Sequence, residues 1–166
     1  HCVYLHMTLI KSISGIRGTI GGKVNENLTP IDTVKYAASY GTYLINKFPN
    51  KIISIVIGRD ARSSGPMIQN LVQNTLIGLG INCIDLGLST TPTVEIAVIN
   101  EKTNGGIIVT ASHNPNNWNA LKLLNEKGEF LDDNAGKKII KIAQKNDFNF
   151  CRVKNIGSII ENDFYM

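Results

Sequence analysis

A serine directly follows a run of apolar residues, a position that suits nucleophilic or phosphate-carrying chemistry. Ser112 lies in the segment Thr-Ala-Ser-His-Asn-Pro at residues 110–115, immediately after the apolar residues 106–109. A buried strand that ends in a polar, proline-stopped loop would bring this hydroxyl to the carboxyl edge of a sheet, where open α/β folds bind ligands. Ser112 is therefore a candidate nucleophile or phosphate carrier.

The histidine next to this serine argues against hydrolase chemistry. On an extended segment, neighbouring side chains point to opposite sides, so Ser112 and His113 are poorly placed to form the hydrogen bond of a catalytic dyad. The Gly-x-Ser-x-Gly pattern of many serine hydrolases is also absent from the sequence. Activation of Ser112 must then come from elsewhere, unless Ser112 and Asn114 merely cap a turn.

Arginines stand in two other glycine-containing segments. Arg17 lies within Ser-Gly-Ile-Arg-Gly at residues 14–18, and Arg59 and Arg62 lie within Gly-Arg-Asp-Ala-Arg-Ser-Ser-Gly at residues 58–65. Glycines let a ligand approach the backbone, a guanidinium binds phosphate in a bidentate manner, and a helix N-terminus favours anions. Both segments are candidate phosphate sites, although each could also be an ordinary turn, with Arg59 paired to Asp60.

One lysine interrupts an apolar segment ten residues beyond Ser112. Lys122 lies between leucines in residues 121–124, where burial would lower its pKa and allow it to act as a base. The alternative is that Lys122 occupies the solvent face of a hairpin formed with residues 129–131.

The elements needed to position these residues alternate between strands and helices. Apolar residues recur at helical spacing after Thr29, after Ser63 or Ser64, after Thr91 and after Asp132, which predicts four helices. Each predicted helix has a proline or an acidic residue in its first turn. Apolar, β-branched segments predict strands at 52–57, 81–86 and 106–109, with short strand pieces within 8–24 and no clear element beyond about residue 146. This pattern predicts an α/β fold, namely a three-layer α/β/α sandwich with a mixed, largely parallel sheet.

Composition limits the class of protein. The chain has 166 residues, of which 43% are hydrophobic, enough for one well-buried domain. The net charge of +4 comes from scattered lysines, which disfavours nucleic-acid binding, and no apolar run approaches the ~20 residues of a membrane span. Three widely spaced cysteines without a Cys-x-x-Cys pair favour a reducing, cytoplasmic location. Residues 1–6 precede Met7 and are interpreted as an upstream or non-native extension.

Taken together and in order, the motifs resemble a known enzyme family. The segments Ser-Gly-Ile-Arg-Gly, Gly-Arg-Asp-Ala-Arg-Ser-Ser-Gly, Thr-Ala-Ser-His-Asn-Pro and Asn-Ala-Leu-Lys are similar to the first domain of the α-D-phosphohexomutases, which include phosphoglucomutase, phosphomannomutase and phosphoglucosamine mutase. The resemblance covers nearly all of residues 8–165. It assigns residues 7–150 to domain I and 151–166 to the start of a linker to a second domain. Ala120 departs from the pattern by replacing the usual glycine.

The resemblance implies a role for each candidate residue. Ser112 would carry a phosphoryl group between a hexose phosphate and a hexose 1,6-bisphosphate, so that phosphate moves between positions 1 and 6. Lys122 or His113 would transfer a proton, and Arg17 would lie near the transferred phosphate. The residues expected to bind phosphate or substrate are Arg17, Arg59, Asn114 and Lys122. The variant Trp-Asn-Ala-Leu-Lys favours phosphoglucosamine as the substrate, with phosphomannose and phosphoglucose as alternatives.

The resemblance also implies a magnesium ion. In the family, a phosphoserine oxygen and three aspartates of an Asp-Gly-Asp-Gly-Asp-Arg loop bind Mg²⁺, and here Ser112 would supply that oxygen. No such loop occurs in these 166 residues. We therefore expect the remaining domains of the same enzyme to complete the site, and this chain alone to bind Mg²⁺ weakly and to lack mutase activity. The alternative is a non-catalytic phosphosugar-binding or regulatory module.

Overall fold

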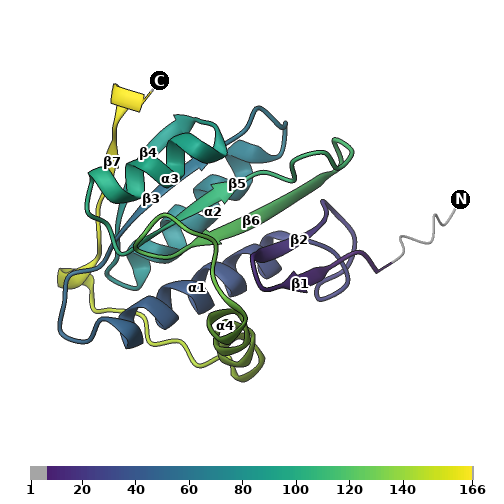
Figure 1. Cartoon of the computed structure of the whole chain (residues 1–166). Coiled ribbons are helices and arrows are strands. Elements are labelled where there is room, and N and C mark those ends of the chain that lie inside the picture. The colour runs from purple at the N-terminus through teal and green to yellow at the C-terminus, as the bar shows by residue number, and fades with distance from the viewer. Residues whose placement is uncertain (1–6, 166) are drawn as a thin grey trace, which may run out of the picture.

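The computed structural model describes residues 7–165, so the proposed extension at residues 1–6 lies outside the described part. Seven strands form one sheet (Figure 1). They are β1 (Ile10–Ser12), β2 (Gly15–Thr19), β3 (Ser54–Arg59), β4 (Asn82–Leu88), β5 (Gly105–Val109), β6 (Trp118–Leu124) and β7 (Ile159–Glu161). The α-helices are α1 (Pro30–Lys47), α2 (Gly65–Gly78), α3 (Thr91–Asn100) and α4 (Asp133–Lys145). Two short 3₁₀ helices, Val153–Asn155 and Asp163–Tyr165, lie near the end of the chain.

The sheet is mixed, with a parallel half and an antiparallel half. The strand order is β1-β2-β6-β5-β3-β4-β7. The pairs β5-β3, β3-β4 and β4-β7 are parallel, and the pairs β1-β2, β2-β6 and β6-β5 are antiparallel. The α/β fold class and the mixed sheet are thus as predicted, with the parallel strands confined to one half.

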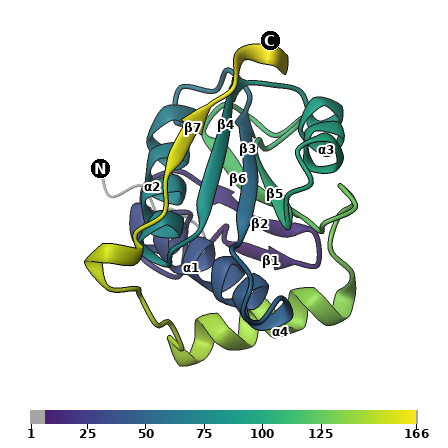
Figure 2. The ribbon, with the colours of Figure 1, turned by 90° about the vertical axis from the view of Figure 1, so that its left-hand side faces the viewer.

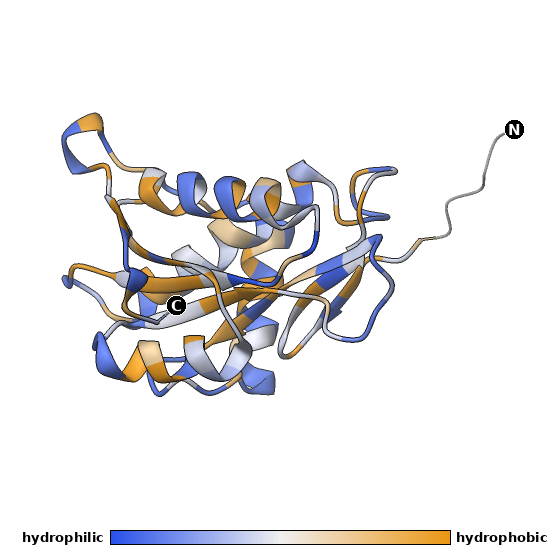
Figure 3. Ribbon diagram, turned by 90° about the horizontal axis from the view of Figure 1, so that it is seen from above, coloured by the Kyte–Doolittle hydropathy of each residue, from blue (hydrophilic) through white to orange (hydrophobic). Residues whose placement is uncertain are grey.

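Helices cover both faces of the sheet and make the molecule a three-layer sandwich. On one face, α1, α2 and α4 bury side chains such as Leu44, Leu76 and Ile139 against the sheet. On the other face, α3 packs Val94 and Val98 against it. Figure 2 shows the sheet between α2 and α3, and Figure 3 shows apolar strands in the middle layer between helices that carry both hydrophilic and hydrophobic residues.

Local sequence signals explain how α1 begins and where it docks. Thr29 caps the helix, its side chain accepting a hydrogen bond from the Asp32 backbone N–H, and Pro30 occupies the first helical turn, as predicted. The buried Tyr40 hydroxyl donates to the Leu124 carbonyl at 2.6 Å and accepts from the Gly106 N–H at 3.1 Å. Burial raises the pKa of Tyr40, so the hydroxyl stays a donor and fixes α1 to β5 and β6.

Two sequence predictions about the second half of the chain are wrong. The expected hairpin between residues 121–124 and 129–131 is reduced to a short antiparallel contact, because β6 pairs mainly with β2 and β5. This contact consists of the bridge Leu124–Phe130 and two backbone hydrogen bonds, from Leu131 N–H to the Leu123 carbonyl and from Asn125 N–H to the Glu129 carbonyl. The expectation of no regular element after residue 146 missed β7, whose Ile160 pairs with Ile84 of β4. Three exposed residues that pair with a strand about 75 positions earlier in the chain leave no local signal. The assignment of residues 151–166 to a linker stays a prediction.

Among residues 7–165, no helix combines the length and the apolar character needed to span a lipid bilayer.

Candidate active site

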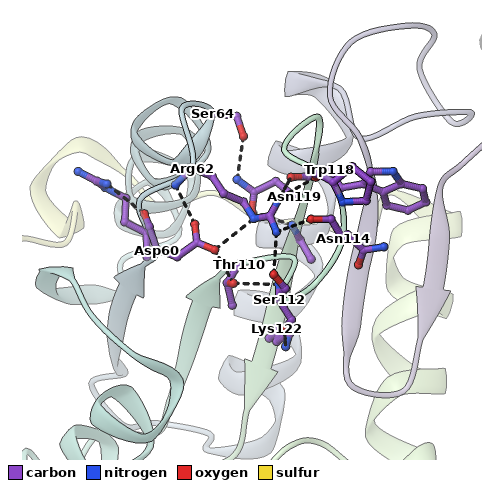
Figure 4. A network of polar contacts seen from close by, with 12 residues as sticks. Asp60, Arg62, Ser64, Thr110, Ser112, Asn114, Trp118, Asn119 and Lys122 are labelled. Atoms are coloured by element: carbon purple, nitrogen blue, oxygen red, sulfur yellow. Dashed lines mark hydrogen bonds and ion pairs between the residues drawn. The ribbon is translucent and has the colours of Figure 1, made fainter.

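The motif residues converge at one end of the sheet. Strands β3 and β5 are parallel neighbours, with Arg59 in register with Val109, so the loops that follow them leave the sheet side by side. The backbone N–H of Asp60 donates to the Val109 carbonyl at 3.1 Å and joins the two loops. This geometry brings residues 60–64 against residues 110–117 (Figure 4).

Ser112 occupies a strained turn at this edge. Its φ of 52° lies in the left-handed region, which costs a residue other than glycine roughly 1–2 kcal/mol. Its backbone N–H donates to the Thr110 hydroxyl at 3.1 Å, and Asn114 N–H donates to the Ala111 carbonyl at 3.0 Å. The segment is therefore not extended, and the alternation argument that separated Ser112 from His113 does not apply to it.

Lys122, rather than His113, is the hydrogen-bond partner of Ser112. Strand β6 lies antiparallel to β5, with Lys122 opposite Ile108, on the face of the sheet that α3 covers further along. The half-buried Lys122 side chain extends along this face, and its Nζ donates to Ser112 Oγ. The Lys122 side chain thus has a partner in Ser112 as well as contact with solvent. His113 is exposed, and no hydrogen bond within the described chain joins it to Ser112.

Arg17 lies on the same face of the sheet, one strand further out. On β2, Gly15 pairs with Lys122 and Arg17 pairs with Ala120, so Arg17 and Lys122 project from the same side. A Cβ on Gly15 would lie 2.1 Å from the Leu121 carbonyl oxygen, so only glycine permits this close pairing. Arg17 is exposed, and its guanidinium makes no hydrogen bond or ion pair within residues 7–165.

A pocket joins these two cations. Its walls come from the β1-β2 hairpin and from β6, and it can receive a ligand beside Lys122. The lining residues are Ser12, Ser14, Gly15, Arg17, Ala120, Leu121 and Lys122. An anion such as a phosphate could contact two positive side chains in this pocket, Arg17 and Lys122. Ser112 Oγ lies next to the Lys122 ammonium.

A third cation, Arg62, is committed to the protein. Its side chain is about 10% exposed, and its Nε donates to Asp60 Oδ2 at 3.2 Å. Its Nη atoms donate to backbone carbonyls of the serine loop and the strand that follows it. The acceptors are Pro115 (2.7 Å), Ser112 (2.8 Å), Asn114 (2.8 Å) and Trp118 (3.1 Å). The segment that contains Arg62 was predicted as a candidate phosphate site, but the Arg62 side chain bonds to the protein instead.

Two further polar residues complete this network, and the sequence analysis missed both. The Thr110 hydroxyl donates to Asp60 Oδ2 at 2.6 Å. The buried Asn119 amide donates to the Ser64 hydroxyl at 2.8 Å, which ties β6 to the beginning of α2. Ser64 stands at the N-cap position as predicted, but its side chain makes no capping hydrogen bond. The sequence signal for this network was the pair Asp60 and Arg62, which stand two positions apart directly after a predicted strand.

The remaining predicted site residues, Arg59 and Asn114, make no hydrogen bond to the Ser112 side chain within the described residues. Arg59 donates to the Asp60 carbonyl at 3.2 Å and packs beside Gly65 at the start of α2. Asn114 is half-buried and is tied to Arg62 through its backbone carbonyl. Their predicted phosphate-binding roles stay predictions.

The residues present do not by themselves make a magnesium site. Mg²⁺ prefers octahedral oxygen coordination with carboxylate ligands. No group of three or more His, Cys, Asp or Glu side chains suited to a metal occurs in the described residues. The nearby carboxylate of Asp60 is engaged by Arg62 and Thr110, and Ser112 Oγ faces the ammonium of Lys122.

Comparisons with known proteins identify the family of this chain. The family model described as phosphoglucomutase/phosphomannomutase, alpha/beta/alpha domain I, matches residues 9–150. A phosphoglucosamine mutase from Nautilia profundicola is 37% identical over 142 residues, 84% of this chain and 31% of the relative. A phosphoglucomutase/phosphomannomutase from Thermococcus kodakarensis is 32% identical over 148 residues, 88% of this chain and 32% of the relative.

Solved structures show the same fold. The crystal structure of a phosphoglucomutase/phosphomannomutase family protein from Burkholderia thailandensis superposes with a TM-score of 0.76 at 22% identity, covering 93% of this chain and 33% of that one. The chain thus carries a phosphohexomutase-type α/β/α domain. It belongs to the phosphoglucomutase/phosphomannomutase family and corresponds to its domain I. It spans about one third of the length of the curated relatives it matches.

Proposed function

We propose that this chain is the serine-bearing domain of a phosphohexomutase, in which Ser112 carries the phosphoryl group. The hydrogen bond from Lys122 Nζ to Ser112 Oγ is the observation that carries the proposal. The Ser112 hydroxyl is hydrogen-bonded to an ammonium and lies beside a pocket lined by Arg17, whose guanidinium makes no hydrogen bond within residues 7–165. This arrangement suits the transfer of a negatively charged phosphoryl group. Phosphoryl transfer depends mainly on positioning and on neutralising charge, and these side chains supply both.

Lys122 gives the transfer a route for the proton. When phosphoserine donates its phosphoryl group to a sugar hydroxyl, the bond from phosphorus to Oγ breaks and a new bond to the sugar oxygen forms. The leaving Oγ takes a proton from Lys122, while the sugar hydroxyl gives its proton to a base such as His113, which returns it to the sugar oxygen that leaves in the return step. In the return step, Ser112 attacks the other phosphate of the hexose 1,6-bisphosphate, and Lys122 takes the proton back. His113 remains the second candidate for proton transfer at the sugar.

Arg17 would bind the phosphate that is being transferred, with Arg59 and Asn114 as further candidate contacts. We propose hexose phosphates as substrates, with glucosamine phosphate first, since the Nautilia relative carries that name. Mannose and glucose phosphates stay open. Mg²⁺ would take one oxygen from phosphorylated Ser112 and its other ligands from domains beyond this chain. Within residues 7–165, Cys83 and Cys151 are unpaired, which suits the cytoplasmic location that we propose.

Phosphorylation of Ser112 by a bisphosphate tests the proposal. The chain, joined to the remaining domains of its enzyme, is incubated with glucose 1,6-bisphosphate and Mg²⁺, and its intact mass and Ser112 peptide are followed by mass spectrometry. We expect an increase of about 80 Da, the mass of one phosphoryl group, mapped to Ser112 and absent from the Ser112→Ala variant. We expect no isomerisation of hexose phosphates by the chain alone.

The competing function predicts a different result. A non-catalytic phosphosugar-binding module would bind the bisphosphate, as measured by calorimetry, without any covalent adduct. Saturable binding with an unmodified Ser112 would therefore contradict the proposed function. A serine hydrolase would instead be labelled on Ser112 by a fluorophosphonate.

A further inference from the structure

The conformation of Ser112 needs a cause outside its own side chain. A left-handed φ is unfavourable for serine, and the residue is exposed, so packing does not hold it in place. Such strain persists only where the surroundings determine it. The interactions that surround the Ser112 backbone, rather than its hydroxyl, should therefore reveal what imposes this conformation.

Arg62 provides the first set of these interactions. A guanidinium has five N–H donors, and the five hydrogen bonds made by Arg62 equal that number, leaving none for a ligand. Four of the five acceptors are carbonyls of residues 112–118, and one of them is the carbonyl of Ser112 itself. Arg62 thus crosslinks the two ends of the serine loop (Figure 4).

Asp60 and Thr110 provide the second set. Asp60 Oδ1 accepts from the Arg62 N–H at 3.1 Å, and its Oδ2 accepts from both Arg62 Nε and the Thr110 hydroxyl. The same Thr110 oxygen then accepts from the Ser112 N–H at 3.1 Å. Ser112 is therefore held on both sides of its Cα: at the N–H through Thr110 and at the carbonyl through Arg62.

We propose that Asp60, Arg62 and Thr110 form a loop clamp that imposes the left-handed conformation of Ser112 and directs its hydroxyl to Lys122. The clamp contacts only backbone atoms of Ser112, so the hydroxyl is free to gain and lose a phosphoryl group while the loop keeps its shape. Asp60 and Arg62 are positioning residues, because neither touches the hydroxyl that reacts. The clamp itself rests on the hydrogen bonds, and only its consequence for catalysis rests on the proposed function.

Hydrogen exchange measures the clamp without any assumption about function. Amide exchange is followed by mass spectrometry in the whole chain and in the variants Arg62→Lys, Thr110→Val and Thr110→Ser. The matched control is Arg152→Lys, at an exposed arginine outside the network. We expect Arg62→Lys and Thr110→Val to speed exchange in peptides covering 111–118 by about tenfold or more, since loss of about 1.4 kcal/mol corresponds to a factor of ten. Thr110→Ser, which keeps the hydroxyl, should exchange like the wild type.

The same variants then test the consequence for phosphoryl transfer. We expect the maximal rate of Ser112 phosphorylation by glucose 1,6-bisphosphate to fall at least tenfold in Arg62→Lys and Thr110→Val, and to recover in Thr110→Ser. The bisphosphate concentration for half-maximal rate should change less than threefold. A purely structural role would instead speed exchange throughout the sheet and lower the yield of folded protein.

Each outcome has a separate meaning. Unchanged exchange at 111–118 in both Arg62→Lys and Thr110→Val overturns the clamp. Faster local exchange with an unchanged phosphorylation rate also overturns it as a positioning device. If the wild-type chain is never phosphorylated while local exchange responds as expected, the clamp stands and the proposed function fails.

Discussion

Arg62 and Arg17 lie at the same edge of the sheet but in opposite circumstances. Arg62 is nearly buried, and all of its donors bond to the protein, whereas Arg17 is exposed and bonds to no other residue in the described chain. A satisfied guanidinium stabilises a loop, and an unsatisfied one beside a pocket is available to a ligand. The number of free donors, rather than residue type, therefore separates the positioning residue from the candidate binding residue.

The largest effect on the rate of phosphoryl transfer is expected at Lys122, which contacts Ser112 Oγ and lines the same pocket as Arg17. Replacing Lys122 by methionine keeps the length and apolar stem but removes the amine that exchanges a proton with Ser112 Oγ. We expect Lys122→Met to slow Ser112 phosphorylation by about 10²–10⁴-fold, the usual contribution of a general acid or base. The melting temperature should stay close to that of the wild type, as followed by circular dichroism. A rate within threefold of the wild type would rule out Lys122 as the group that takes the proton from Ser112.

Loss of Arg17 should weaken ligand binding without destabilising the fold. Arg17→Met removes a charge-assisted contact of about 1.5–3 kcal/mol, so we expect the affinity for glucose 1,6-bisphosphate to fall by roughly 10- to 100-fold in calorimetry. The melting temperature should not change, because Arg17 makes no hydrogen bond in the described chain. Unchanged affinity would place the phosphate elsewhere, with Arg59 as the next candidate.

Loss of Arg62 should lower the stability of the fold and leave ligand affinity nearly unchanged. Arg62→Met leaves four carbonyls and the Asp60 carboxylate without their donor, at a cost of about 1–3 kcal/mol in the free energy of unfolding. We therefore expect a melting temperature several degrees lower, since 1 kcal/mol corresponds to roughly 2–4 °C in a domain of this size. Bisphosphate affinity should change little. A variant with unaltered stability would show that the carbonyls are satisfied by water at no cost.

The smallest effect tests the strain at Ser112. Glycine adopts a left-handed φ without steric penalty, whereas alanine pays the same penalty as serine because it also has a Cβ. We expect Ser112→Gly to be more stable than Ser112→Ala by about 1 kcal/mol in thermal unfolding. Equal stability of the two variants would mean that the loop carries no strain for the clamp to maintain.

The sequence predicted the elements better than their connections. The capping residues Thr29 and Asp132 and the spacing of apolar side chains located α1 and α4, because helix signals are local. Strand pairing is not local. Both β6, which joins β2 and β5 instead of forming the expected hairpin, and the short edge strand β7 depended on partners elsewhere in the chain.

The candidate site divides in the same way. The order of the motifs was enough to predict that Arg17, Ser112 and Lys122 belong to one site, since each lies in a segment with a recognisable pattern. The partners of Ser112 could not be predicted from spacing, because they depend on its left-handed turn and on the register of β6 against β5. Arg62 could be counted as a cation from the sequence, but only the three-dimensional structure reveals that its donors are all occupied.

One kinetic measurement tests this division of roles most directly. The rate of Ser112 phosphorylation is recorded against glucose 1,6-bisphosphate concentration for the wild-type chain, Arg17→Met and Arg62→Met. We predict that Arg17→Met raises the concentration for half-maximal rate at least tenfold, while Arg62→Met mainly lowers the maximal rate. If the two variants change the same parameter to the same extent, the distinction between a ligand-binding arginine and a loop-positioning arginine is wrong.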